Sequence, residues 1–297
     1  VCQNITMSLD ASGNVNITPA DVDGGSSVSC GTLVSSIDIS SFDCTNIGQN
    51  NVVLTVTNSN NVSRSCTAVV TIVDSAAPVV VCQDISVVLD GSGNATITAA
   101  DIDNGSSDNY GIASTTLDIT SFDCSDVGTN NVQLTVTDIN GNSSVCSAVV
   151  TVSDDIPPIV ACQNITLQLD ATGNASIVAL DVDSGSTDFC GIASRSIDVS
   201  SFDCNDIGAN TVVLTVTDTS GNSASCNAIV TVEDTVGPAV ICQNITVQLD
   251  TAGTATLAPS DIDNGSTDSC GIATLDIDQI FFSCANMKQL VSQLGHL

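Results

Sequence analysis

The feature that most constrains this chain is a cysteine pattern that returns every 80 residues. Eleven of the cysteines form three series: Cys2, Cys82, Cys162 and Cys242; Cys44, Cys124, Cys204 and Cys284; and Cys66, Cys146 and Cys226. A fixed period of this length indicates a modular array in which each period is one structural unit. The sequence therefore predicts repeats at residues 1–77, 78–157 and 158–237, and an incomplete repeat at 238–297.

Each repeat has the pattern of a series of short β-strands. In the second repeat the runs Val132 to Thr137 and Val145 to Val152 alternate apolar and polar residues. The Asn140-Gly141 pair between them is a strong signal for a β-hairpin. Frequent turn residues and the lack of a helical pattern predict an all-β fold of tandem β-sandwiches. Short linkers that contain proline, such as Asp154 to Pro158, favour sandwiches arranged end to end as a rod.

The charge of the chain restricts its partners. It contains 33 Asp and Glu residues against 3 Lys and Arg residues, a formal net charge of −30. This charge excludes nucleic acids and anionic membranes as natural partners and favours cations. No apolar run is long enough for membrane insertion, and no signal peptide is present, so we expect a mature or partial chain. Aromatic residues make up only 2% of the chain, so each core must be small and aliphatic.

The cysteines lack the close pairs of a zinc site, which indicates disulfides formed in an extracellular or cell-surface setting. Four cysteines per repeat allow three pairings. Because the first and last strands should be neighbours, we predict the pairs Cys2–Cys66, Cys82–Cys146 and Cys162–Cys226. The remaining pairs would then be Cys30–Cys44, Cys190–Cys204 and Cys270–Cys284. Tyr110 replaces the corresponding cysteine of the second repeat and should leave Cys124 single.

The recurring motifs resemble a known repeat family. The segments CQNITVQLD, DIDNGSTDSCGI, SFDC, VVLTVTDTSGNS and VTVEDTVGP are similar to those of HYR-like (hyalin repeat-like), four-cysteine repeats of very large bacterial surface proteins, notably Bacteroidetes-type adhesins. The resemblance extends over residues 1 to about 284. It implies immunoglobulin-like sandwiches in an extracellular stalk or adhesin that has no enzymatic activity of its own.

An acidic loop that contains glycine returns once per repeat and is best preserved from Asp261 to Ile272. In an immunoglobulin-like sandwich this loop, the hairpin between the last two strands and the incoming linker lie at one pole. Acidic and amide residues from these three elements should therefore meet at each junction between repeats. The predicted sets are Asp74, Asp101, Asp103, Asn104, Asp108, Asp138, Asn140 and Asn142; Asp154, Asp155, Asp181, Asp183, Asp188, Asp218 and Asn222; and Glu233, Asp234, Asp261, Asp263, Asn264 and Asp268.

Calcium is the cofactor that these predicted sets fit best. It binds roughly six to eight oxygen ligands from carboxylates, amides and backbone carbonyls. A cation would also offset the repulsion between clustered carboxylates. Two alternatives remain open, namely another divalent cation and acidic loops that are only solvated. In the first repeat Val28 and Asn58 stand where the second has Asp108 and Asp138, so this pole should bind calcium weakly or not at all.

Glycosylation is a further prediction from the linkers. Ser75, Thr235 and Thr251 lie in D-S/T-aliphatic segments similar to an O-glycosylation signal of Bacteroidetes. A glycan at such a residue would shield the junction between repeats. No catalytic constellation is present, and the only histidine is His296, so we expect that the chain is not an enzyme.

The tail from 279 to 297 departs from the repeat and allows two interpretations. It can form an amphipathic ending with Leu290, Leu294 and Leu297 on one helical stripe, or it can result from a shifted reading frame. Either way the fourth repeat would lack two strands and expose a sheet edge.

These observations predict a structural extracellular protein. It would be a fibril subunit or adhesin stalk, stiffened by calcium and stapled by disulfides, that self-associates into a filament. The alternative is a cell-surface adhesin module that binds a glycan or a protein through the loops at one pole.

Overall fold

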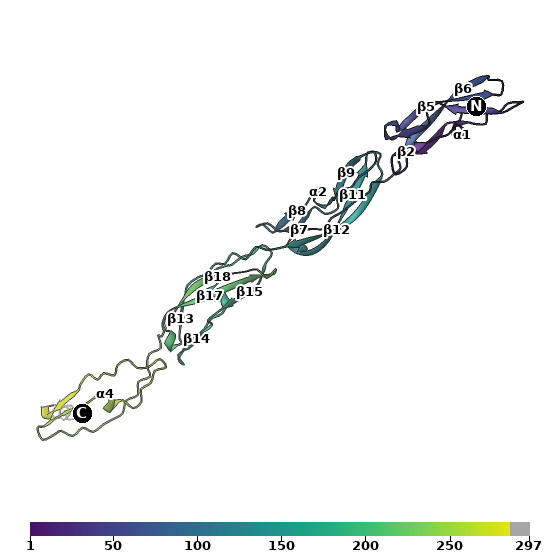
Figure 1. Ribbon diagram of the computed structural model, residues 1–297. Coiled ribbons are helices and arrows are strands. Elements are labelled where there is room, and N and C mark those ends of the chain that lie inside the picture. The colour runs from purple at the N-terminus through teal and green to yellow at the C-terminus, as the bar shows by residue number, and fades with distance from the viewer. Residues whose placement is uncertain (286–297) are drawn as a thin grey trace, which may run out of the picture. The chain divides into compact units, whose positions relative to one another are not determined.

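The computed structural model describes residues 1–285 and divides into two compact units, Val1–Ile156 and Pro157–Leu297 (Figure 1). Each unit contains two of the 80-residue repeats predicted from the cysteine pattern. Strands are the main regular structure of the repeats and the described helices are only one turn long, so the predicted all-β fold of tandem immunoglobulin-like sandwiches is confirmed. The arrangement of the repeats as a rod stays a prediction.

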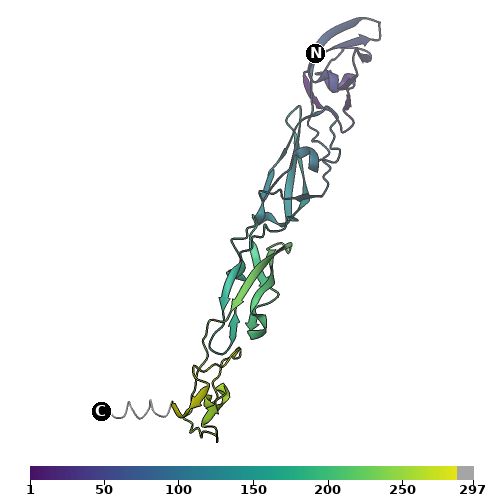
Figure 2. The ribbon, with the colours of Figure 1, turned by 90° about the vertical axis from the view of Figure 1, so that its left-hand side faces the viewer.

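The second repeat shows the architecture of a complete sandwich. Its larger sheet has the strand order β7-β12-β11-β9, and its smaller sheet pairs β8 with β10. The strands are β7 (Ile85–Val88), β8 (Asn94–Thr96), β9 (Ile112–Leu117), β10 (Ser121–Asp123), β11 (Gly128–Asp138) and β12 (Ser143–Ser153). Strands β11 and β12 form the predicted antiparallel hairpin, shown in teal in Figure 2. Strand β7 runs parallel to β12, so the first and last strands of the sandwich are neighbours as predicted.

Alternation along the long hairpin places the apolar residues of the second repeat on one face. Val132, Leu134 and Val136 of β11 are at most 1% exposed, and Val150 of β12 is fully buried. Phe122 of the smaller sheet is 3% exposed. Complete burial of one such side chain contributes roughly 1.5–3 kcal/mol, so these few residues provide much of the stability of the sandwich.

The first and third repeats have the same order of elements as the second. The first contains β1 (Ile5–Ser8), β2 (Asn14–Asn16), α1 (Pro19–Val22), β3 (Leu33–Ile37), β4 (Ser41–Asp43), η1 (Cys44–Asn46), β5 (Gly48–Asn58) and β6 (Ser63–Val73). The third contains β13 (Ile165–Gln168), β14 (Asn174–Ser176), α3 (Ala179–Val182), β15 (Ile192–Ile197), β16 (Ser201–Asp203), η3 (Cys204–Asp206), β17 (Gly208–Asp218) and β18 (Ser223–Glu233). Their strands pair as in the second repeat.

A one-turn helix opens each acidic loop, where the sequence predicts no helix. These helices include α2 (Ala99–Ile102) and α4 (Pro259–Ile262), and a 3₁₀ turn, η2 (Cys124–Asp126), follows β10. Ile102 of α2 is fully buried, so the helix turns an apolar residue into the sandwich. One turn is too short to show a helical period in the sequence, which explains why it was missed.

The fourth repeat is less complete within the described residues. It contains α4 and the strands β19 (Thr254–Thr256) and β20 (Phe281–Ser283), whereas residues 245–248 and 272–277, which correspond to β13 and β15 of the third repeat, form no strand. Its Phe282 is half-buried, whereas the equivalent Phe202 of the third repeat is 3% exposed. Residues 286–297, which include most of the tail and its proposed leucine stripe, lie outside the described residues.

The disulfides confirm one part of the predicted pairing and correct the other. The structure contains the predicted pairs Cys2–Cys66, Cys82–Cys146 and Cys162–Cys226. Cys204, however, is bonded to Cys270 of the following repeat. The predicted pairs Cys190–Cys204 and Cys270–Cys284 are therefore wrong, and Cys30 and Cys44 are free thiols rather than a pair. Cys124, predicted to be single, is disulfide-bonded, as is Cys190.

The physical reason for these corrections is the position of Cys204 and of its equivalents in the other repeats. Cys204 lies in η3, directly after the short strand β16, and its Sγ lies 3.7 Å from the carbonyl oxygen of Gly173. It meets the acidic loop of the next repeat rather than the loop of its own. The predicted pairing keeps both disulfides within one repeat, whereas this bond joins two consecutive repeats.

Candidate metal centre at a junction between repeats

The hairpin of the second repeat provides a buried carboxylate. Asp138 ends strand β11 and is 1% exposed. Its Oδ1 accepts hydrogen bonds of 2.8 Å from the backbone N–H groups of Asn140 and Asn142, and its Oδ2 accepts one of 2.8 Å from Nδ2 of Asn142. Burial raises the pKa of Asp138, but these hydrogen bonds outweigh burial and lower the pKa below its usual value. The carboxylate is therefore ionised at neutral pH.

The acidic loop of the same repeat provides a second carboxylate. Oδ1 of Asp108 accepts hydrogen bonds from the backbone N–H groups of Tyr110, at 2.8 Å, and Gly111, at 3.1 Å. Gly111 has a φ of 114°, a conformation that favours glycine and lets the backbone fold around the carboxylate. The loop thus holds Asp108 in a fixed orientation through its own backbone.

The linker that leaves the first repeat provides a third carboxylate. Asp74 follows strand β6 and is 9% exposed. Its Oδ1 accepts a hydrogen bond of 3.0 Å from the backbone N–H of Ala76, and its Oδ2 accepts one of 3.0 Å from Nδ2 of Asn140. Its backbone carbonyl accepts a hydrogen bond of 3.2 Å from Nδ2 of Asn142. The linker of one repeat is therefore bonded to the hairpin of the next.

These three carboxylates form one cluster, which we call the junction triad. One oxygen each of Asp74, Asp108 and Asp138 lies within 4.8 Å of the other two. Arg195 forms an ion pair with Asp183, and among residues 1–285 no basic side chain forms an ion pair with a carboxylate of the triad. Three unpaired negative charges at this separation repel one another, and a bound cation would reverse that repulsion. The all-oxygen donor set fits a hard cation such as Ca²⁺.

The first two aspartates of the acidic loop do not join the triad, contrary to the prediction. Oδ2 of Asp101 accepts hydrogen bonds of 2.7 Å from the backbone N–H and the hydroxyl of Thr98 at the start of α2. Oδ1 of Asp103 accepts one of 2.9 Å from the backbone N–H of Ser106. Asn104 is exposed. Asp101 and Asp103 therefore fix the local fold of the loop, and the side-chain hydrogen bonds with Thr98 and Ser106 lower their pKa values.

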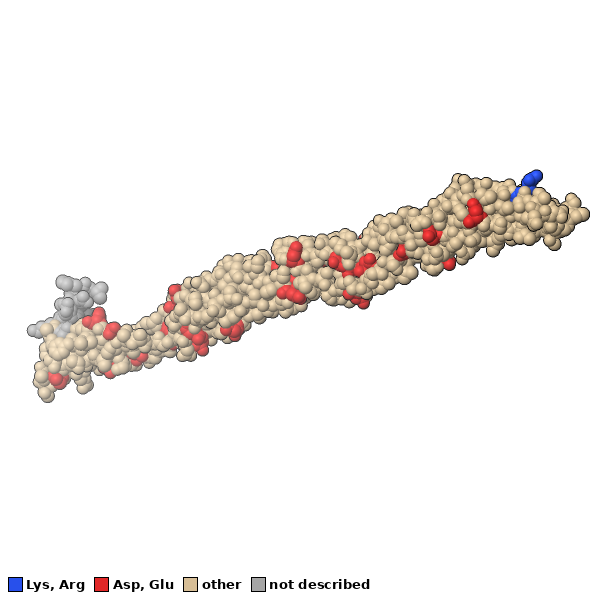
Figure 3. All heavy atoms as spheres, turned by 45° about the horizontal axis from the view of Figure 1, so that its top comes forward, with Lys and Arg blue, Asp and Glu red and all other residues tan. Residues whose placement is uncertain are grey.

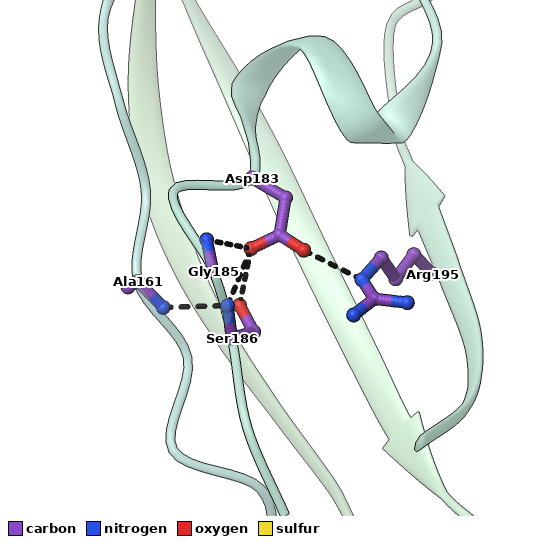
Figure 4. Close-up of polar contacts among 5 residues, drawn as sticks. All are labelled: Ala161, Asp183, Gly185, Ser186 and Arg195. Carbon is purple, nitrogen blue, oxygen red and sulfur yellow. Dashed lines mark hydrogen bonds and ion pairs between the residues drawn. The ribbon is translucent and has the colours of Figure 1, made fainter.

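In the third repeat the aspartate equivalent to Asp103 is Asp183, which forms a salt bridge with Arg195. Asp183 accepts hydrogen bonds at Oδ1 from the backbone N–H groups of Gly185 and Ser186, and at Oδ2 from Nε of Arg195, 2.5 Å away (Figure 4). Its side chain is 3% exposed. Burial raises the pKa of Asp183, whereas the hydrogen bonds from Ser186 and the charge of Arg195 lower it by more. Asp183 is thus occupied by a salt bridge, and Asp181 caps α3 through the backbone N–H of Val178.

Other predicted residues of the third repeat reproduce the local geometry of the junction triad. Asp218 is 1% exposed, and its Oδ1 accepts hydrogen bonds from the backbone N–H groups of Ser220 and Asn222. Oδ1 of Asp188 accepts one of 2.8 Å from the backbone N–H of Cys190. In the first unit, Asp154 is 7% exposed and Asp155 is exposed.

The junction between the third and fourth repeats has a different composition. Asp234, Asp268 and Cys270 each offer one atom within 4.8 Å of the others, but the sulfur of Cys270 is bonded to Cys204. Glu233 does not join them, because its Oε2 accepts a hydrogen bond of 2.7 Å from Gln168. The other predicted residues cap the loop or are exposed, namely Asp261, Asp263 and Asn264. Within residues 1–285 this junction provides two carboxylates and a disulfide sulfur, whereas the junction triad provides three carboxylates.

The acidic side chains are not confined to the junctions. On the face drawn in Figure 3, Asp and Glu side chains are spread over both units, whereas Lys and Arg side chains occupy one small patch. The junction triad is distinguished by the burial of Asp74 and Asp138 rather than by its charge alone. Within residues 1–285 no helix is long and apolar enough to cross a membrane.

Comparison with known proteins supports the repeat type. Residues 153–232 match the HYR domain family. The chain is also similar to the extracellular cadherin domains 1–4 of protocadherin gamma B7, with 14% identity, a TM-score of 0.34 and coverage of 86% of this chain and 81% of that one. An I-band fragment of titin matches with 12% identity, a TM-score of 0.38 and coverage of 78% and 96%. Such TM-scores carry no argument about function, so the HYR match and the strand topology are what support HYR-like, immunoglobulin-like repeats.

Proposed function

We propose that this chain is a structural extracellular protein, a fibril subunit or adhesin stalk that self-associates into a filament and whose repeat junctions are stiffened by calcium. The observation that carries the proposal is the junction triad, in which the linker of one repeat and two loops of the next place three carboxylates together. The disulfides and the HYR match support an extracellular location.

Calcium would act as a clamp between the two repeats. The triad supplies three anionic oxygens, and Ca²⁺ can complete its shell with backbone carbonyls, amide oxygens and water. Asn140 and Asn142 now donate through Nδ2 to Asp74, and a turn of either amide would present its Oδ1 instead. An ion that binds Asp74 and Asp138 at once would restrict the linker, because these residues belong to different repeats.

Terbium luminescence tests the proposed site directly. The chain has one tyrosine, Tyr110, and no tryptophan. Its backbone N–H donates a hydrogen bond to Asp108, so Tyr110 adjoins the triad and can sensitise a bound Tb³⁺ ion, which accepts the same oxygen ligands as Ca²⁺. We expect terbium emission on excitation of Tyr110, saturation at low terbium and displacement by calcium.

A pair of Asp-to-Asn variants provides the control. Asp138→Asn removes a triad carboxylate and should reduce the terbium affinity at least tenfold. Asp84→Asn removes a carboxylate from the same repeat, at a position where the first and third repeats have Asn4 and Asn164. Asn4 and Asn164 accept the same kind of backbone hydrogen bond as Asp84 does from Val149, so this variant should leave the affinity unchanged. Equal emission from both variants would contradict the proposal.

The pole of the first repeat favours the alternative function, recognition of a glycan or a protein. A cavity of about 410 Å³ is lined there by apolar residues such as Val28, Leu33 and Val62, with Arg64 at its side. Val28 and Asn58 replace two residues of the junction triad at this pole. A screen of glycans and surface proteins against the wild type and Val28→Asp would test it, since binding that the substitution does not alter would exclude this pole.

Glycosylation remains a prediction that the structure permits. Ser75, Thr235 and Thr251 are all exposed. The hydroxyl of Thr235 donates a hydrogen bond of 2.8 Å to Oε1 of Gln168, which makes it the least available of the three. Intact mass of the protein from its natural source would show whether any of them carries sugar.

A further inference from the structure

One cysteine in each repeat lies on a glycine turn, and we call it the turn cysteine. The turn cysteines Cys44, Cys204 and Cys284 have their Sγ atoms 3.6, 3.7 and 3.7 Å from the carbonyl oxygens of Gly13, Gly173 and Gly253. In all three the glycine closes a turn by donating a backbone hydrogen bond to the aspartate three residues earlier. The local structure around the turn cysteine is therefore the same in the first, third and fourth repeats.

A second cysteine lies in the acidic loop, two residues after the aspartate position of the junction triad, and we call it the loop cysteine. In the second unit the turn cysteine Cys204 is bonded to the loop cysteine Cys270 of the next repeat. In the first unit Tyr110 replaces the loop cysteine. The same surfaces nevertheless meet there, because Sγ of the turn cysteine Cys44 lies 3.3 Å from the carbonyl oxygen of Asn109. The contact between repeats thus forms with or without the covalent bond.

The first repeat has a loop cysteine with a free thiol, and the fourth repeat has a turn cysteine with a free thiol. Each is one half of the contact described above. Cys30 is an exposed loop cysteine, and Cys284 is an exposed turn cysteine. Cys30 has the place that Cys270 has in the fourth repeat, and Cys284 the place that Cys204 has in the third. The two halves differ from each other, so copies that join through them do so head to tail and leave a free half at either end.

We propose that Cys284 of one copy forms a disulfide with Cys30 of the next copy, so that the filament is covalently linked along its length. This proposal rests on the self-association proposed above and assigns its chemistry. The template is the Cys204–Cys270 bond, in which the same two positions are joined within the chain. Each link would continue the contact between consecutive repeats across the boundary between two molecules.

The reaction needs a disulfide as oxidant, such as oxidised glutathione. The thiolate of Cys284 attacks the oxidant and releases one thiol, which leaves a mixed disulfide on Cys284. The thiolate of Cys30 of the next copy then attacks the protein sulfur and releases the second thiol. Two cysteine thiols thus lose two electrons and two protons, and one small disulfide is reduced to two thiols.

The other two free thiols do not have these complementary surroundings. Cys242 is exposed but stands where Cys162 stands in the third repeat, and Cys162 pairs with Cys226 of its own hairpin. Cys44 is half-buried against Asn109 of the second repeat. Substitutions of Cys242 and Cys44 are therefore matched controls.

The experiment uses the full chain in a glutathione redox buffer, analysed by non-reducing electrophoresis. The wild type should give a ladder of oligomers. Neither Cys30→Ser nor Cys284→Ser should form a species larger than the monomer, because two copies of the same variant lack one of the two cysteines that the intermolecular disulfide requires. A mixture of the two should give a dimer and nothing larger, since it contains one compatible pair. Cys242→Ser and Cys44→Ser should keep the ladder.

Peptide mapping and electron microscopy complete the test. Digestion with a protease that cleaves at aspartate should release a linked peptide that contains Cys30 and Cys284. A ladder that survives Cys30→Ser, a linked peptide through Cys242, or a chain that stays monomeric in the oxidising buffer would overturn the proposal. Filaments that form in reductant as readily as in the oxidising buffer would also overturn it, while the self-association proposed above would stand.

Discussion

The substitution Asp138→Asn should change stability in opposite directions with and without calcium. In the first repeat Asn58 occupies the same position, and its Oδ1 accepts hydrogen bonds of 3.0 Å from the backbone N–H groups of Asn60 and Val62. An asparagine therefore supports the same hairpin turn. The substitution removes the charge of Asp138 but keeps the local fold.

The magnitude follows from the geometry of the junction triad. At 4.8 Å, two unit charges repel by about 3.5 kcal/mol at an effective dielectric constant of about 20 and by about 0.9 kcal/mol in water. Asp138 takes part in two of the three pairs, so its neutralisation relieves about 2 to 7 kcal/mol of repulsion. The loss of the charged acceptor for Nδ2 of Asn142 costs about 1.5–3 kcal/mol. The relief exceeds the cost over most of these ranges, by about 2 kcal/mol at their midpoints, so in a chelator the variant should be more stable than the wild type.

Calcium should reverse the order of stability of the wild type and the Asp138→Asn variant. At a free calcium concentration about 100 times the dissociation constant, an ion that binds only the folded state adds about 2.7 kcal/mol to the stability of the wild type. The variant, with two carboxylates left, should gain much less. The wild type should then be the more stable protein.

Urea unfolding followed by Tyr110 fluorescence is the appropriate assay, because this single tyrosine lies in the loop that carries Asp108. The two proteins should be compared in chelator and in millimolar calcium. The control is Asp84→Asn, whose stability relative to the wild type should be the same in both conditions. The reasoning is refuted if the Asp138→Asn variant is less stable than the wild type in chelator, or if calcium stabilises both proteins equally.

Three further predictions concern the disulfides and the salt bridge. Tyr110→Cys should form a disulfide with Cys44 by analogy with Cys204–Cys270, which thiol titration would detect as one free thiol fewer than in the wild type, whereas an unbonded variant would show one more. Arg195→Ala should destabilise its repeat by about 1–3 kcal/mol in a calorimetric scan because it leaves the buried carboxylate unpaired, whereas substitution of the exposed Arg64 should have no effect. Because the pKa of Asp183 is lowered in the fold, its stabilising contribution is present above the unfolded pKa of about 3.9 and is lost as the pH falls through the folded value, which acid titration by circular dichroism would show.

The strand pattern could be predicted from the sequence because its signals are local. Alternation from Val132 to Thr137 and the Asn140-Gly141 turn define the hairpin that the structure contains. The neighbouring first and last strands then account for disulfides such as Cys82–Cys146. In each case the evidence lies within one repeat.

The pairing of the turn and loop cysteines could not be predicted, because it depends on the contact between repeats. The sequence does contain one relevant signal, the replacement of a loop cysteine by Tyr110. Pairing within the repeat would leave Cys124 unpaired, whereas pairing to the preceding repeat leaves Cys44 unpaired. The structure has Cys44 as a free thiol, but spacing alone does not distinguish the two.

The aspartates of the acidic loop have different roles that the repeating acidic pattern alone does not distinguish. Asp101 caps a one-turn helix, Asp103 caps a turn and only Asp108 joins the junction triad. The T-x-x-D spacing from Thr98 to Asp101 is a recognisable capping signal that could have separated the first from the others. The identity of Arg195 as the partner of Asp183 requires the fold, because it depends on strand β15 passing beside the loop.

The Cys204–Cys270 bond also determines how the chain responds to a pulling force. The segment that it encloses overlaps the one enclosed by Cys162–Cys226, with sequence separations of 66 and 64. The shortest covalent path through the third repeat therefore crosses Cys162–Cys226, follows the chain through strand β17 to Cys204 and crosses to Cys270, and it bypasses residues 163–203 and 227–269. Neither repeat can therefore release its full contour length when it unfolds. The two overlapping disulfides therefore limit how far this part of the chain can extend under load.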